Sequence, residues 1–209
     1  MNILRVNGRF LLLDLLAVLF GISSWISING LWVELPLLVS RLPEGWGLAS
    51  YLSIIVQLAN LGPLSYAFLR WITGGKVPEK VCIFVLLMVG TTSGFLLSRF
   101  WSGQAEVFGS THSLALFLLV FFLSLVDCTS SILFLPFMAL YRDIYLNSYL
   151  IGEGLSGFIP SIAALAQGVG GNPHCQNETR INETTGQVEW VVVKVVPEPR
   201  FSIDVSYSS

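Results

Sequence analysis

The stretch Asn-Gly-Leu-Trp-Val-Glu-Leu-Pro-Leu-Leu-Val, at residues 29–39, carries the strongest indication of the fold class. It places an amide (Asn29), a carboxylate (Glu34) and a helix-bending proline (Pro36) at the end of a long apolar run that begins near Phe10. A bilayer core accepts such groups only where they face protein or a water-filled cavity, because an unpaired carboxylate in hydrocarbon is costly. The stretch therefore predicts a membrane span whose polar face is turned toward a solute path.

The composition of the whole chain indicates the same class. Hydrophobic residues make up 54% of the 209 residues, and charged residues only 11%. A soluble domain carries about 25% charged residues, so the excess apolar surface of this chain must face a lipid bilayer. The formal net charge of −2 gives no reason to expect a nucleic-acid partner. The predicted fold class is all-α, a polytopic transmembrane helical bundle.

Five apolar runs are long enough to cross a bilayer, which takes roughly 20 residues. They are continuous and do not alternate, which favours helices over barrel strands. The first run has the basic start of a signal peptide, but it continues past the usual length without a clear cleavage site, so we expect a retained span. We place the spans at about residues 10–39, 48–69, 81–98, 113–141 and 144–169. Residues 1–169 then form the bundle, and residues 170–209 an extracellular glycosylated loop or truncated tail.

The basic residues of the short connections predict the orientation, because cytoplasmic loops are enriched in Lys and Arg. One side of the predicted bundle holds most of them, and the opposite side holds Arg41 and Arg99. The chain therefore has a cytoplasmic N-terminus. The residues on the cytoplasmic side are Arg5, Arg9, Arg70, Lys76, Lys80 and Arg142.

The polar tail gives independent support for this orientation. Asn177 and Asn182 each begin an Asn-x-Thr glycosylation sequon, which is modified only on the lumenal face. Cys175 lies in the same segment without an obvious partner. Because the chain stops at Ser209 without another span, we expect a truncated form of a longer carrier.

Amides and carboxylates within the spans are the candidate functional groups. Asn29 and Trp32 are three residues apart and share one helical face, and Gln57 and Asn60 have the same spacing. Glu34 either sits at the interface or faces a cavity. For the pair in the second span, hydrogen bonding between helices and contact with a solute are equally good interpretations.

Asp127 lies in the middle of the fourth span and is followed by hydroxyl residues, among them Thr129 and Ser130. An intramembrane carboxylate is by default a functional hypothesis. Proton coupling and a protonated acid hydrogen-bonded to Thr or Ser both remain open. Glu153 is flanked by glycines that permit close helix packing, so packing competes with solute contact at this position.

Prolines favour a carrier over a simple membrane anchor. Pro36, Pro63, Pro136 and Pro160 place one proline in each of four spans. Each removes a backbone hydrogen bond and is expected to bend its helix. Bent helices that line a cavity are common in transporters.

Several motifs in series resemble the animal riboflavin transporter family of the solute carriers. Beside residues 29–39 they are Leu-Pro-Glu-Gly-Trp at 42–46, Gln-Leu-Ala-Asn-Leu-Gly-Pro at 57–63, Leu-Val-Asp-Cys-Thr-Ser-Ser at 125–131, Phe-Leu-Pro-Phe-Met at 134–138 and Gly-Glu-Gly-Leu-Ser-Gly at 152–157. The resemblance covers roughly residues 22–168, which would be the N-terminal half of such a carrier. It implies a fold like the N-terminal lobe of a major-facilitator-like protein and sodium-independent riboflavin uptake across the plasma membrane. It also implies a retroviral envelope protein as a partner, since some family members serve as entry receptors.

The expected mechanism of the complete carrier is alternating access, with riboflavin as the transported substrate rather than a cofactor. Amides and hydroxyls would pair with the flavin edges, Trp32 would stack on its face, and the carboxylates would contact the ribityl chain, gate the path or sense protons. An enzyme is not expected, because the sequence has no nucleophile elbow, phosphate loop or metal-ligand cluster. The alternatives are a non-transporting receptor or interaction fragment, or a carrier for another small polar aromatic solute. The candidate substrate-binding residues are Asn29, Trp32, Glu34, Gln57, Asn60, Asp127, Thr129, Ser130 and Glu153.

Overall fold

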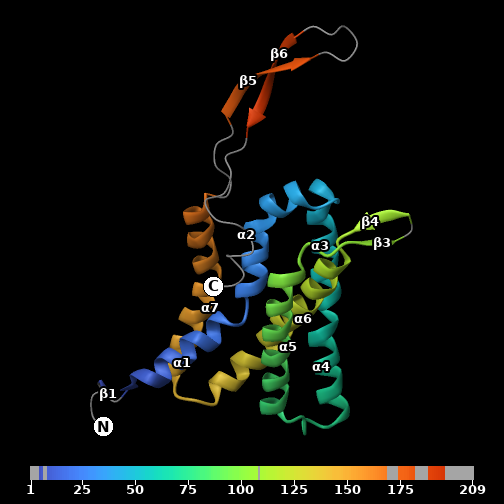
Figure 1. The fold of residues 1–209 in the computed structure, drawn as a ribbon. Helices are drawn as coiled ribbons and strands as arrows, with labels where there is room; N and C mark the ends of the chain where they lie inside the picture. The colour runs from blue at the N-terminus through green and yellow to red at the C-terminus, as the bar shows by residue number, and fades with distance from the viewer. Residues whose placement is uncertain (1–4, 7–8, 108, 169–173, 182–187, 196–209) are drawn as a thin grey trace.

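The computed structural model describes residues 5–6, 9–107, 109–168, 174–181 and 188–195, and the described part is a helical bundle with three small hairpins (Figure 1). The predicted all-α class is confirmed. The helices are α1 (Leu11–Ile22), α2 (Ile26–Arg41), the 3-10 turn η1 (Gly45–Gly47), α3 (Leu48–Ala59), α4 (Leu61–Ile72), α5 (Glu79–Phe100), α6 (Leu114–Ala139) and α7 (Asp143–Gln167). The antiparallel hairpins pair β1 (Arg5–Val6) with β2 (Arg9–Phe10), β3 (Ala105–Val107) with β4 (Ser110–His112), and β5 (His174–Ile181) with β6 (Val188–Val195).

The described helices overlap the five predicted apolar runs, with one difference in the first. Four helical segments of the described chain are long and apolar enough to cross a membrane: residues 45–72, 79–100, 114–139 and 143–167. The first predicted span is not one helix but the pair α1 and α2, which are bent by 49° at the break between them and make a fifth span if counted together. Helix α2 continues through Pro36 to Arg41, so the break lies at residues 23–25 and not at the proline.

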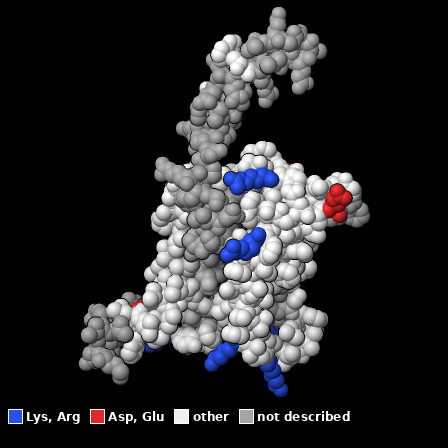
Figure 2. Space-filling view, viewed as in Figure 1, with Lys and Arg blue, Asp and Glu red and all other residues white. Residues whose placement is uncertain are grey.

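The outer surface of the bundle is apolar, as a lipid-facing surface requires. Leu64, Phe84, Phe95 and Phe158 are each between 60% and 65% exposed. Charged side chains are sparse on the face drawn in Figure 2. In a protein without a bilayer such exposure would be a large aggregation liability.

Helix α6 is the centre of the bundle, with contacts to every helix from α2 to α7. Its first half joins one apolar core with α2 and α3, in which Leu31, Leu52 and Val120 are almost completely covered. Its second half joins another core with α1, α5 and α7, around Phe134 and Tyr149. The polar segment of α6 at residues 127–130 lies between these two cores.

Helices α1 and α7 approach each other through glycines. A Cβ atom on Gly21 would collide with the carbonyl oxygen of Tyr149, and one on Gly152 would collide with the carbonyl oxygen of Val18. Only glycine permits two backbones to come this close. The small residues around Glu153 therefore include one, Gly152, whose role is packing.

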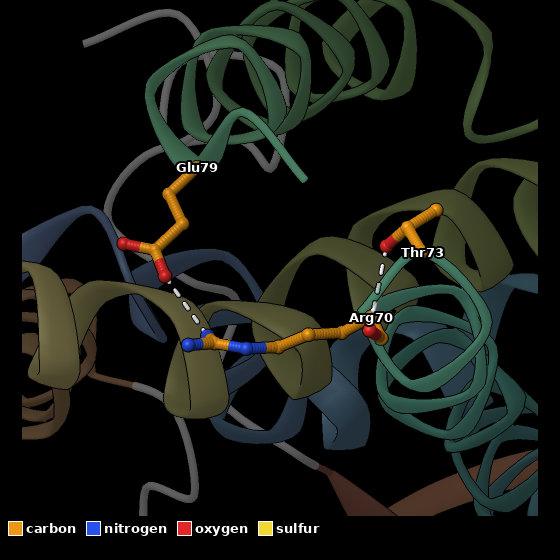
Figure 3. Close-up of polar contacts among 3 residues, drawn as sticks. All are labelled: Arg70, Thr73 and Glu79. Carbon is orange, nitrogen blue, oxygen red and sulfur yellow. Dashed lines mark hydrogen bonds and ion pairs between the residues drawn. The ribbon is translucent and has the colours of Figure 1, made fainter. Parts of the chain in front are cut away.

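The connections alternate between the two ends of the bundle, as five crossings require. The hairpins β3–β4 and β5–β6 lie at one end, and β1 and the connection between α4 and α5 lie at the other (Figure 1). That connection is closed by an ion pair of 2.8 Å between Arg70 Nη1 and Glu79 Oε1, while the Thr73 hydroxyl donates to backbone carbonyls of the last turn of α4 (Figure 3). Gly74 and Gly75 have φ values of 59° and 81°, which make the reversal possible.

Candidate functional site: two interrupted spans around helix α6

Two serine side chains lie at the break in the first span. Helix α1 ends at Ile22, and the Ser23 and Ser24 hydroxyls donate to the carbonyl oxygens of Phe20 (2.7 Å) and Gly21 (2.6 Å). Serine bonds of this kind compete with the regular helical pattern. Because Ser24 is completely buried, the backbone groups that the break frees must find partners within the protein.

Helix α6 supplies some of those partners. The Ser130 hydroxyl lies 3.4 Å from the Ser24 carbonyl oxygen, which it reaches across the break. The backbone amide of Ile28, in the first turn of α2, lies within interaction range of the Asp127 carboxyl group. Asp127 is only 2% exposed, and its Oδ2 atom has no hydrogen-bond partner among the described residues. A carboxylate at a helix N-terminus is favourable, since the freed amide groups carry partial positive charge.

The hydroxyls next to Asp127 in sequence bond to the backbone of α6. Thr129 donates to the Leu125 carbonyl oxygen (2.6 Å), and Ser130 donates to the Asp127 carbonyl oxygen (2.7 Å) as well as toward Ser24. The expected bond from Thr or Ser to a protonated Asp127 carboxyl group is therefore not among the bonds that these two hydroxyls make.

The second span is interrupted at Asn60, between α3 and α4. Pro63, four residues after Ala59, cannot donate the hydrogen bond that would continue the helix. The Asn60 side chain donates to Gln57 Oε1 (3.2 Å), and both amides are exposed. The predicted shared face of these two residues is thus present, but in the described chain they bond to each other.

Both interruptions meet the same part of α6. A Cβ atom on Gly62, two residues after the second break, would lie 2.5 Å from Thr129 Oγ1 and 3.1 Å from Leu125 Cγ. Asp127 and Ser130, on the opposite side of that helical turn, face the first break. The polar segment of α6 thus lies between the bent first span and the short irregularity at Asn60 in the second span, which continues as one helical segment over residues 45–72.

The remaining candidates lie on α2 and α7. The Asn29 side chain is half-buried and lies 3.5 Å from the Ser156 hydroxyl of α7. Glu153, half-buried on the same face of α7, is three residues from Ser156. Trp32 packs against the apolar core, and Glu34 is 5% exposed and faces the interior. The candidates therefore form separate groups rather than one cluster.

The described cavities do not bring these groups together. A cavity of about 260 Å³ lies between α1, α6 and α7 and is lined by Leu16, Phe20, Met138 and Tyr145 among other residues, none of them a candidate. Another, of about 290 Å³, lies between α4, α5 and α6 and includes Thr129. Because the candidate groups face different helices, a common solute path among them is not formed by the described residues.

Sequence reasoning missed a carboxylate that joins two spans, Glu44. It follows α2, and its side chain, 1% exposed, accepts hydrogen bonds from the Ser113 amide (2.6 Å) and hydroxyl (2.8 Å) at the start of α6. Partial burial would raise the pKa of Glu44, but the bonds from Ser113 outweigh this effect, so that the pKa lies below its ordinary value. The available signal was an acid five residues beyond the predicted end of the first span, within the motif Leu-Pro-Glu-Gly-Trp at 42–46.

The first sequon and Cys175 both lie in strand β5. Asn177 lies in β5, whereas Asn182 lies outside the described residues. Cys175, in the same strand, is exposed and forms no disulfide with another described cysteine. Both sequons remain predicted glycosylation sites.

The helices and their apolar surface define a multi-pass helical membrane protein. A family model described as solute carrier family 52, riboflavin transporter, matches residues 9–208, and the chain belongs to this family. It is 46% identical over 92% of its length to a Danio rerio riboflavin transporter, member 3-A, of which it covers 44%. It is 51% identical to member 3 of Bos taurus and 49% identical to member 3 of Homo sapiens, over 83% of this chain and 37% of each relative.

The chain thus spans about two fifths of the length of the curated relatives it matches, between 36% and 44%. No solved structure matches the chain. The expected likeness to a major-facilitator lobe therefore stays a prediction, whereas the expected family is confirmed.

Proposed function

We propose that this chain is part of a plasma-membrane carrier, not an enzyme, that takes riboflavin into cells by alternating access. The proposal rests on the family match over residues 9–208 and on relatives named riboflavin transporters that are 46–51% identical to the chain. The break between α1 and α2, beside the polar segment of α6, also supports a transport function, because a broken helix in a membrane is tolerated where protein or a water-filled path receives its backbone groups.

The chemistry of riboflavin fits the candidate side chains. The flavin ring has imide and carbonyl edges and a flat apolar face, and the ribityl chain carries several hydroxyls. Gln57 and Asn60 are exposed and free to exchange their mutual bond for bonds to a solute, and Asn29 and Glu153 are half-buried between α2 and α7. Trp32 would stack on the ring, and Thr129, Ser130, Glu34 and Asp127 remain candidates for polar contact or gating.

The proposed orientation has the N-terminus in the cytoplasm. The end of the bundle with the Arg70–Glu79 connection would then be cytoplasmic, and the hairpins β3–β4 and β5–β6 extracellular. Protease protection of an N-terminal tag and endoglycosidase-sensitive mass at Asn177 and Asn182 test this topology. A tag accessible from outside intact cells would contradict it. A viral envelope partner stays a prediction of the family resemblance.

The decisive test measures riboflavin binding and uptake with the 209-residue chain. Riboflavin fluorescence reports binding to the purified chain in nanodiscs, and radiolabelled riboflavin reports uptake in cells whose surface expression is checked by biotinylation. We expect saturable binding, weakened about tenfold by Asn29→Leu, since a lost hydrogen bond to a desolvated polar group costs roughly 1–2 kcal/mol. Ser53→Ala, an exposed hydroxyl on α3 that bonds only to the Ala49 carbonyl oxygen among the described residues, is the matched control.

Surface display without riboflavin binding or uptake would contradict the proposal for this chain. It would favour the alternative that the chain is a receptor or an interaction fragment. Equal binding of unrelated flat aromatic solutes would instead favour a carrier of different specificity.

A further inference from the structure

We propose that Asp127 is a positioning residue, which caps the N-terminal end of α2 and so holds the outer part of the first span against α6. This role deepens the proposed function by selecting gating among the roles considered for this carboxylate. Its structural part, the capping of α2, does not depend on riboflavin transport.

The break at residues 23–25 leaves backbone amides at the start of α2 that need hydrogen-bond acceptors. The initial turn of a helix presents amide groups without partners inside that helix. Ser24 is fully buried, so water cannot satisfy the groups beside it. The Ser23 and Ser24 side chains both donate to carbonyl oxygens at the end of α1, and they therefore leave the amides of α2 to another residue.

Helix α6 provides an acceptor, the Asp127 carboxyl group, at the start of α2. The carboxyl group of Asp127 lies within interaction range of the Ile28 amide in the first turn of α2. Ser130, one helical turn further along α6, reaches the Ser24 carbonyl oxygen at 3.4 Å. A donor and an acceptor of the break are thus both met by one face of α6, and Asp127 Oδ2 remains without a partner among the described residues.

A second contact between a carboxylate and a helix start joins the end of α2 to the start of α6. Glu44, three residues after the end of α2, accepts both hydrogen bonds from Ser113 at the start of α6. A carboxylate thus lies at the N-terminal end of each helix: Asp127 of α6 at the start of α2, and Glu44, from the segment after α2, at the start of α6. Helix α2 and the first half of α6 therefore contact each other at both ends. Helix α1 instead packs closely against α7 at Gly21 and Gly152. The break at residues 23–25 separates these two units.

Hydrogen exchange of the chain in nanodiscs tests the cap directly. Asp127→Ala should accelerate amide exchange in residues 26–28 roughly five- to tenfold, the factor expected for loss of an N-terminal cap. Asp127→Asn should remain within about twofold of the unmodified chain, because its amide oxygen can still accept the bond from Ile28. Ser124→Ala is the matched control: this serine is also buried on α6, and its hydroxyl has no partner among the described residues.

Unchanged exchange in Asp127→Ala, or equal acceleration in the Ala and Asn variants, would overturn the proposal. If the Ala variant does not fold, Asp127→Asn decides alone: exchange within about twofold of the unmodified chain supports the cap, and faster exchange overturns it. Where uptake is measurable, Asp127→Ala should lose maximal rate at equal surface level, and Asp127→Asn should retain more of that rate than Asp127→Ala. Equal losses in the two variants would contradict the positioning role, whereas absence of uptake in the unmodified chain would contradict only the proposed function.

Discussion

The two interrupted spans differ in where their interruption originates. The break between α3 and α4 has a local cause in Pro63, and its side chains Gln57 and Asn60 are exposed and bond to each other. The break between α1 and α2 has no proline, and is completed by contacts with Asp127 and Ser130, about 100 positions later in the chain.

This difference separates a break that local sequence explains from one that depends on tertiary contacts. Asn60 and Gln57 can leave each other at little cost because both face outward. The groups around Ser24 are buried, so any movement at the first break must exchange one set of internal partners for another. The first break is therefore the better candidate for a gate with two defined states.

The largest loss of stability is expected for Gly21→Ala, which disrupts the close packing of α1 against α7. The added Cβ atom would collide with the Tyr149 carbonyl oxygen, and the two backbones would have to separate. We expect a loss of roughly 3 kcal/mol or more in the free energy of unfolding, measured by denaturation in detergent. Gly30→Ala, in the same span with no heavy atom within 4 Å of its Cβ position, should be neutral or stabilising. Equal losses in the two variants would show that the close contact with α7 is not important.

Glu44→Gln tests the other end of the α2–α6 pair. It removes the charge that accepts both bonds from Ser113, so we expect a loss of about 1.5 kcal/mol at neutral pH. Because the folded pKa of Glu44 lies below the ordinary value of 4.5, its contribution is complete above that value and is lost as the pH falls through the folded pKa. The difference between the unmodified chain and the variant should therefore shrink in acid. A difference that is constant from pH 7 to pH 3 would contradict this account.

Gly62→Ala tests how closely the second break depends on α6. Its Cβ atom would meet the Thr129 hydroxyl, a side chain that can rotate, rather than backbone. We expect a loss of about 1 kcal/mol, smaller than that of Gly21→Ala. Gly154→Ala is the control, since nothing lies within 4 Å of its Cβ position. A thermal shift as large as that of Gly21→Ala would remove the distinction between the two breaks.

The smallest effect is expected for Asn60→Ala. The bond to Gln57 is exposed and is shared by neighbouring residues, so its loss should change stability by less than about 0.5 kcal/mol. If the amide contacts riboflavin, binding should nevertheless weaken while the melting temperature stays the same. A large loss of stability without a change in binding would instead make Asn60 a structural residue.

Much of the fold followed from local patterns. The apolar runs predicted the number and place of the spans, since a run of that length has to cross the bilayer wherever its partners lie. The candidate polar residues were recognisable because amides and acids are conspicuous in apolar helices. Their partners were not: Ser156 beside Asn29, and Ser113 beside Glu44, lie 127 and 69 positions away in the sequence.

The sequence alone was sufficient for the class of protein, the succession of its spans and the resemblance to its family, because hydrophobic length and contiguous motifs are local properties. Only the tertiary structure placed the break of the first span at residues 23–25 instead of Pro36, and brought Asp127 to the start of α2. The physical reason is that a helix continues through a proline at the loss of one bond, whereas a break inside a membrane protein persists only where another helix receives the groups it frees.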